Sequence, residues 1–113
     1  MNNYQNNKHV VLRDEKTPQD SRFLDAQIND KGDLVFHGQD LGSGVEDIFD
    51  FVEYEWYWTI KQHDIPKLEK AIDSDGNIVE QLNKDFSDEN ASNLYDFLKK
   101  NEIPFDSWSR TGD

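Results

Sequence analysis

The residues best placed to carry chemistry are the carboxylates Glu53 and Glu55, which stand two positions apart in the segment 51–60. On a β-strand this spacing places both carboxyl groups on one face, about 7 Å apart. That separation suits the acid and base of a glycosidase. However, acids that alternate along a strand usually mark its solvent-facing side, and 113 residues leave little room for a sugar-binding cleft. We therefore expect this pair to be solvated rather than catalytic.

Other signatures of catalysis or metal binding are missing from the sequence. There is no Cys, which excludes thiolate nucleophiles, disulfides and Cys-based zinc sites. Gly42-Ser43-Gly44 lacks the spacing of a hydrolase nucleophile elbow, and no phosphate-binding loop is present. The His residues are far apart in the sequence, at His9, His37 and His63. We expect no enzyme and no cofactor; a deep pocket in which His37 or His63 is hydrogen-bonded to a buried carboxylate would reverse that expectation.

The segment that begins at Asp73 has the composition of a calcium loop but not its spacing. An EF-hand loop needs Gly at its sixth position and Glu at its twelfth. Here Gly76 comes too early, and Lys84 stands where the Glu would be. A turn that ends a helix is the better interpretation, and we expect no metal site.

The chain is strongly acidic, with 24 Asp and Glu against 12 Lys and Arg and a net charge of −12. Such a charge opposes contact with nucleic acids and anionic lipids and favours a basic partner or cations. The first residues lack the apolar core of a signal peptide, and no apolar run approaches the roughly 18 residues needed to span a membrane. We expect a cytoplasmic protein that binds neither nucleic acid nor a membrane directly.

The acids are concentrated in one part of the chain. The stretch 32–60 contains no Lys or Arg, where average composition would place about three bases. Its acids are Asp33, Asp40, Glu46, Asp47, Asp50, Glu53 and Glu55. Close like charges cost a protein stability. The stretch is either a solvated strand and loop or a surface that steers a basic partner.

Alternating apolar and polar residues predict the strands of an antiparallel sheet. Segments 23–28 and 34–36 flank the turn signal 29–32, which predicts a hairpin. Segment 51–60 is the clearest strand, and 10–12 fits a short one. On segment 51–60 the apolar face carries Val52, Tyr54, Trp56, Trp58 and Ile60, and the polar face carries Glu53, Glu55, Tyr57 and Thr59.

Beyond residue 60 the apolar residues follow the helical period. Asp64 is placed to cap a helix with Pro66 in its first turn, a second helix fits 78–86, and Ser87 is placed to cap a third. The aromatic segment 105–108 could return to the sheet as an edge strand.

Strands followed by helices predict an α+β fold. We expect an antiparallel sheet of three or four strands, with two or three helices packed on one face. The whole should be a single domain over residues 8–113, with residues 1–7 frayed.

Two motifs resemble a known group of sequences. Segment 38–46, Gly-Gln-Asp-Leu-Gly-Ser-Gly-Val-Glu, and segment 53–60, Glu-Tyr-Glu-Trp-Tyr-Trp-Thr-Ile, are similar to motifs of small acidic bacterial proteins with no assigned activity. The likeness runs from about Arg22 to Asp113. In size, charge and layout the chain also resembles the immunity proteins of bacterial toxin systems, and that resemblance implies an inhibitor that binds a protein.

The first motif also makes a structural prediction. Gly42 and Gly44 can adopt positive φ, so residues 39–46 are expected to turn tightly and to bring Asp40 and Glu46 near the acidic strand. If the C-terminal segment folds back, Arg110 would partly neutralise this patch.

These observations favour a non-enzymatic binding module in which acids steer a basic toxin or enzyme and Tyr57 anchors it. The predicted partner-binding residues are Asp40, Glu46, Asp47, Asp50, Glu53, Glu55 and Tyr57. Two other classes remain open. One is a small-ligand or divalent-cation binder that uses Asp40, Glu46 and Asp47. The other is a nucleic-acid mimic whose carboxylates are spaced like phosphates along one face.

Overall fold

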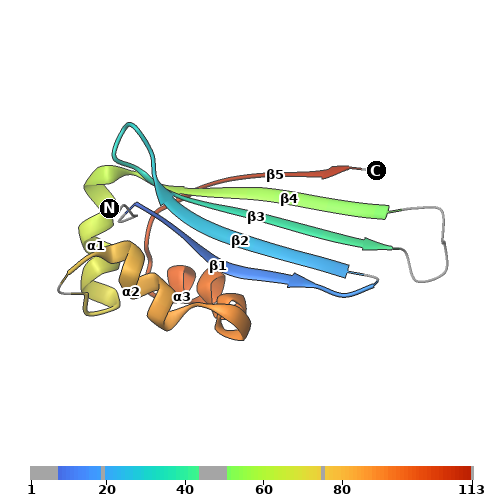
Figure 1. Ribbon diagram of the computed structural model, residues 1–113. Coiled ribbons are helices and arrows are strands. Elements are labelled where there is room, and N and C mark those ends of the chain that lie inside the picture. Colours follow the sequence, from blue (N-terminus) through green and yellow to red (C-terminus); the bar gives the residue numbers. More distant parts are fainter. Residues whose placement is uncertain (1–7, 19, 44–50, 75, 113) are drawn as a thin grey trace.

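The protein has an α+β fold in which one antiparallel sheet carries the described helices on one face (Figure 1). The computed structural model describes residues 8–18, 20–43, 51–74 and 76–112, so the residues 1–7 for which we expected a frayed terminus lie outside it. The strands follow the sheet order β1-β2-β3-β4-β5, each pairing with its sequence neighbour. They are β1 His9–Lys16, β2 Asp20–Ile28, β3 Leu34–Ser43, β4 Phe51–Ile60 and β5 Asp106–Gly112.

The sheet has five strands rather than the three or four that the sequence predicts. The two strands that the sequence marks only weakly are β1 and β5, which lie at its two edges. An edge strand pairs on one side only and tolerates charged and polar residues, so its alternation is weak. For this reason the sequence pattern marks only residues 10–12 and 105–108, whereas β1 and β5 are eight and seven residues long.

The tight turn expected over residues 39–46 is wrong for its first part, because β3 continues to Ser43; it pairs with β2 up to Gly42 and with β4 up to Ser43. Gly42 therefore lies in extended backbone, and Gly44 lies outside the described residues. A Cβ at Gly42 would lie 2.9 Å from Oδ1 of Asp20, the end of an exposed side chain that can move aside. Positive φ is found at Gly32, where φ is 83° in the predicted turn between β2 and β3.

The helical layer contains η1 Gln62–Asp64, α1 Ile65–Ala71, α2 Ile78–Asp85, η2 Asp88–Asn93 and α3 Leu94–Lys100. Asn77 caps α2 by accepting a hydrogen bond from the backbone N–H of Glu80 at 3.0 Å. The two caps expected from the sequence do not form, because neither Asp64 nor Ser87 accepts a cap hydrogen bond with its side chain. Asp64 instead forms an ion pair with Lys67 at 3.0 Å. None of the helices in the described ranges is long and apolar enough to cross a membrane.

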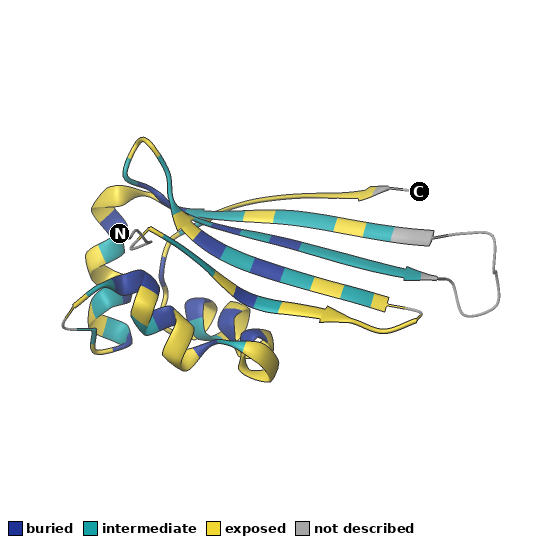
Figure 2. Cartoon of the chain, viewed as in Figure 1, coloured by how far each residue is buried: buried dark blue, intermediate teal, exposed yellow. Residues whose placement is uncertain are grey.

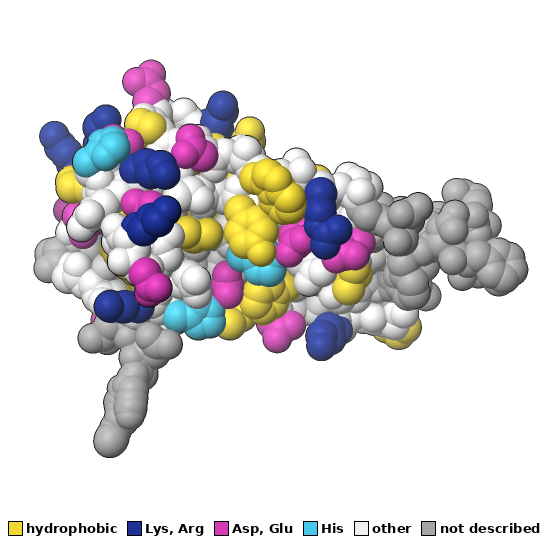
Figure 3. Space-filling view, turned by 90° about the horizontal axis from the view of Figure 1, so that it is seen from above, with side chains coloured by type: hydrophobic (Ala, Val, Ile, Leu, Met, Phe, Trp, Pro, Cys, Tyr) yellow, Lys and Arg dark blue, Asp and Glu magenta, His cyan; other side chains and the backbone are white. Residues whose placement is uncertain are grey.

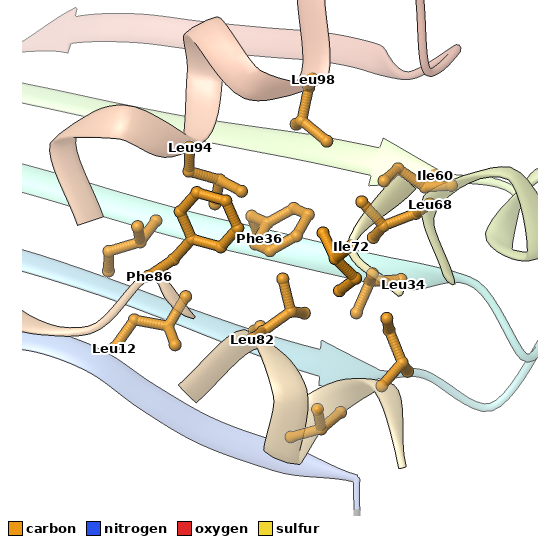
Figure 4. Close-up of a cluster of buried hydrophobic side chains, with 14 of the residues drawn as sticks. Leu12, Leu34, Phe36, Ile60, Leu68, Ile72, Leu82, Phe86, Leu94 and Leu98 are labelled. Atoms are coloured by element: carbon orange, nitrogen blue, oxygen red, sulfur yellow. The ribbon is translucent and has the colours of Figure 1, made fainter. Parts of the chain in front are cut away.

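The core lies between the sheet and the helices (Figure 2), and Figure 4 shows how its side chains meet. Fully buried side chains come from the sheet (Leu12, Leu34, Phe36 and Ile60) and from the helices (Leu68, Val79, Leu82, Leu94 and Leu98). The helices cover the part of the sheet that contains these residues. The Ser43 end of β3 and the Phe51 end of β4 extend beyond them (Figure 1).

Candidate functional site: the uncovered face of the sheet

Side chains alternate between the two faces of a sheet, and here the helices cover only one of them (Figure 1). The register aligns Asp25, His37, Tyr57 and Trp108 in one cross-strand row, and Phe23, Gln39, Glu55 and Arg110 in the next. We call the face that carries these two rows, together with Glu53, the outer face. Figure 3 looks onto it and shows hydrophobic side chains gathered beside a His and several charged groups.

The centre of the outer face is an aromatic row across three strands. The ring of His37 stacks on Tyr57, with centroids 4.5 Å apart and planes 17° from parallel. Tyr57 in turn lies 5.5 Å from Trp108 of β5. These pairs stabilise the sheet by a few tenths to about 1 kcal/mol each. Even so, Tyr57 remains 36% exposed and Trp108 49% exposed.

Beside this row, Glu55 and Glu53 accept hydrogen bonds from neighbouring strands. Nε2 of His37 lies 2.8 Å from Oε2 of Glu55, and Nε of Arg110 donates to Oε1 of the same carboxylate at 3.0 Å. Gln39 donates through Nε2 to Glu53 at 2.6 Å, and Arg110 lies 4.0 Å from that carboxylate. Arg110 therefore partly neutralises the acids of β4, as expected if the C-terminal segment folds back.

These contacts shift two titrations in opposite directions. The hydrogen bond to His37, followed by that from Arg110, lowers the pKa of Glu55. Loss of solvent and the nearby Glu55 carboxylate raise the pKa of Tyr57, so its hydroxyl remains protonated at neutral pH. The outer face at pH 7 thus presents a neutral phenol beside an ionised carboxylate.

We expect His37→Ala to raise the pKa of Glu55 towards the ordinary value of a glutamate. The folded-state pKa of Glu55 is depressed, so its ionisation stabilises the protein above the unfolded-state pKa and ceases to do so as the pH falls through the folded-state value. The variant should therefore have a smaller free energy of unfolding than the wild type at neutral pH. As the pH is lowered, its free energy of unfolding should fall less steeply than that of the wild type. Carboxyl-carbon NMR titration of Glu55, with urea unfolding at several pH values, measures both effects. An unchanged Glu55 titration in the variant would contradict this assignment.

The structure brings together only part of the predicted binding set. Glu53, Glu55 and Tyr57 lie on the outer face, as the alternation of β4 predicts. Asp40 does not join them: it pairs with Arg22 and Tyr54 in the register and lies on the helix-bearing side of the sheet. Glu46, Asp47 and Asp50 lie outside the described residues.

Asp40 belongs instead to a cavity of about 220 Å³ between the sheet and the η2–α3 region. Arg13, Arg22 and Trp56 share this cavity with it. Burial raises the pKa of Asp40, and the charges of Arg22 and Arg13 oppose that shift. The expectation that Asp40 lies near Glu53 and Glu55 is therefore wrong. Because β3 continues past residue 36, its side chains keep alternating, so that Gln39 lies on the outer face and Asp40 on the opposite one.

Sequence reasoning missed three residues of this face, His37, Gln39 and Trp108, and expected Arg110 there only on condition that the C-terminal segment folds back. The alternation of β3 could have placed His37 and Gln39 on this face, because they stand two and four positions after Val35 and residues at this spacing share a face of the strand. Nothing in the sequence reveals that β5 pairs with β4 in the register that places Trp108 beside Tyr57.

His37 meets only part of the condition under which an enzyme would be expected. It is hydrogen-bonded to a carboxylate, but the adjoining hollow, which Asp25 and Tyr57 also line, measures about 180 Å³ and lies on the open outer face. His63 lies 3.2 Å from the buried Asp64, yet its own side chain is 80% exposed. Within the described part of the chain, no three or more His, Asp and Glu side chains are grouped as metal ligands would be.

A scan of family models and searches of curated proteins and of solved structures each return no significant match to the chain.

Proposed function

We propose that this chain is a non-enzymatic protein-binding module that docks a basic surface of a toxin or enzyme on its outer face, in the manner of an immunity protein. The observation that carries the proposal is the exposed pair Tyr57 and Trp108, which lies at the centre of an uncovered sheet face among carboxylates. Occlusion of the partner's basic surface would be the mechanism.

The aromatic pair has the properties of a binding anchor. Tyr and Trp bury large areas at low conformational cost and dominate the energetics of many interfaces. Both rings are held in place by neighbours, Tyr57 by the stacked His37 and Trp108 by Tyr57 itself. A preorganised ring loses less side-chain entropy when a partner covers it.

The charge around the pair favours a basic partner. The chain has a net charge of −12, and Asp25, Glu53 and Glu55 lie in or beside the aromatic row. Arg110 offsets part of this charge through Glu55. Such surface charges act mainly by steering the encounter, and salt screens them over about 10 Å. The association rate with a basic partner should therefore fall steeply as salt increases.

The alternatives from the sequence gain less support. A cation site built on Asp40 has Arg22 and Arg13 as its electrostatic neighbours, which opposes a cation. A nucleic-acid mimic needs a row of free carboxylates along one face, whereas Asp40 lies on the other face from Glu55 and Glu55 is already hydrogen-bonded to His37 and Arg110. No observation favours either class over a protein partner.

The test begins with affinity capture from the native host, after which the captured protein is purified and its dissociation constant measured. Trp108→Ala should weaken binding by about 30-fold, the effect of losing an anchor worth about 2 kcal/mol. Glu53→Lys should mainly slow association and reduce its dependence on salt.

Tyr95→Ala is the matched control, because Tyr95 is also an exposed aromatic but lies on α3, on the helix-bearing side. It should leave the dissociation constant unchanged. If Trp108→Ala and Glu53→Lys also leave binding unchanged, or if only metals or small molecules are captured, the proposed function is wrong.

A further inference from the structure

The two edges of the sheet differ in how well they are protected against pairing with a further strand. At one edge, β1 has an irregularity between Val11 and Arg13, where one residue lacks a cross-strand partner. The helical layer also contacts this strand, and Arg13 donates a hydrogen bond to Ser92 of η2 at 2.8 Å. Bulges and covering elements are the usual means by which a protein prevents further strands from adding to an edge.

At the opposite edge, the described residues provide neither a bulge nor a covering element. β5 pairs with β4 in an unbroken register from Asp106 to Gly112, and it contains neither Pro nor Lys. Its extensive contacts among the described residues are with β4 alone, and each residue from 106 to 111 is exposed. Half of its backbone N–H and C=O groups therefore point away from β4 and are available to another strand.

The sequence of β5 is complementary to itself in one antiparallel register. If two copies pair with Trp108 opposite Trp108, Asp106 of each stands opposite Arg110 of the other, and Ser107 stands opposite Ser109. Moving the centre to Ser107 or Ser109 brings Asp106 or Arg110 opposite a Trp and loses both charge pairs. We propose that a second copy of this chain is the partner of this edge, joined through β5 in the register centred on Trp108.

Asp106 and Arg110 are exposed enough to form these pairs with a second copy. Asp106 is 76% exposed and its nearest cation, Lys61, is 3.9 Å away. Arg110 is 55% exposed although its Nε binds Glu55, and a guanidinium has further N–H groups to donate. All three cross-strand pairs formed by Asp106, Trp108 and Arg110 lie on the outer face, because these residues alternate with Ser107 and Ser109.

The resulting dimer would be a single sheet of two five-stranded halves. A two-fold axis perpendicular to the sheet at Trp108 leaves both helical layers on the same side, at opposite ends of the two central strands. The two outer faces become continuous, and the two Trp108 rings meet at the seam. Such isologous pairing is closed, so it ends at two copies.

Charge reversal tests the register directly. Sedimentation velocity of the purified chain should show a monomer–dimer equilibrium. Asp106→Arg places two Arg opposite each other, and Arg110→Asp places two Asp opposite each other, so each variant should weaken dimerisation at least about tenfold. An equimolar mixture of the two variants restores both opposite-charge pairs and should regain dimers within about threefold of the wild type.

Two reversals elsewhere control for net charge: Glu89→Arg on η2 and Lys31→Asp in the β2–β3 turn, both exposed, should dimerise like the wild type. Circular dichroism confirms that all variants are folded. A wild type that stays monomeric up to about 1 mM overturns the proposal. So does a dimer that neither reversal weakens, or a mixture in which dimers do not return. No binding partner is present in this experiment, so its result is independent of the proposed function.

Discussion

Replacing Gly38 with alanine should destabilise the protein by about 3 kcal/mol, at the upper end of what overpacking costs. Gly38 is buried in β3, the central strand of the sheet. A Cβ at this position would lie 2.0 Å from both Cε2 and Cζ2 of Trp56, far inside van der Waals contact. The indole has little room to retreat, because Tyr54 stacks on it at 5.2 Å and Trp58 lies at 6.0 Å. Urea unfolding measures the loss.

The matched control for this prediction is Gly76→Ala, because a Cβ at Gly76 would meet no atom within 4 Å. Its stability should stay within about 0.5 kcal/mol of the wild type. The double variant Gly38→Ala, Trp56→Leu removes the obstructing ring, so the two changes should combine to much less than their sum. An additive double variant would show that the indole is not what limits residue 38.

Phe36→Ala should cost about 4 kcal/mol, within the range for removing a buried phenyl ring. Phe36 is fully buried in β3, and its ring lies 6.2 Å from that of Trp58. Figure 4 shows it at the centre of the cluster, facing Leu82 and Leu94 from the helices. Since whole domains are stable by only about 5–15 kcal/mol, this one change removes a large share of the total.

Val35→Ala provides the comparison for Phe36, because Val35 is the preceding residue on the same strand and lies on the outer face. Its side chain is only partly buried, so the loss should be about 1 kcal/mol. Chemical unfolding of the two variants therefore reports whether the core is on one side of the sheet. Equal losses would contradict the one-sided core.

The fold class and the bounds and faces of β4 follow from the amino-acid pattern alone. Hydrophobic periodicity is a local property, and on β4 it is strong enough to specify both the bounds of the strand and its two faces. The alternation of β4 therefore predicts that Glu53, Glu55 and Tyr57 share one face, and the register confirms it. The hairpin at 29–32 is also predictable, because its turn residues act locally: Oδ1 of Asn29 accepts hydrogen bonds from the backbone N–H groups of Lys31 and Asp33, and Gly32 adopts positive φ.

The local signals misled where a long-range contact overrides them. Gly42 and Gly44 predict a tight turn over residues 39–46, and local propensity alone favours one. The strand continues because Trp56 of β4 fills the space above Gly38, and because pairing on both sides satisfies its backbone. Extending the strand past residue 36 moves Asp40 to the helix-bearing side and aligns His37 with Tyr57.

The surroundings of the β4 acids and the open edge of the sheet depend on long-range packing. Arg110 stands 55 residues from Glu55 in the chain and reaches it because β5 returns across the whole helical region to pair with β4. The register of such a pairing depends on how the helical layer packs, and no local pattern of β5 encodes it. The same packing places α2 and η2 against β1 and leaves β5 exposed. Composition therefore establishes that the chain is acidic, whereas chain topology determines which acids are paired and which surface is free.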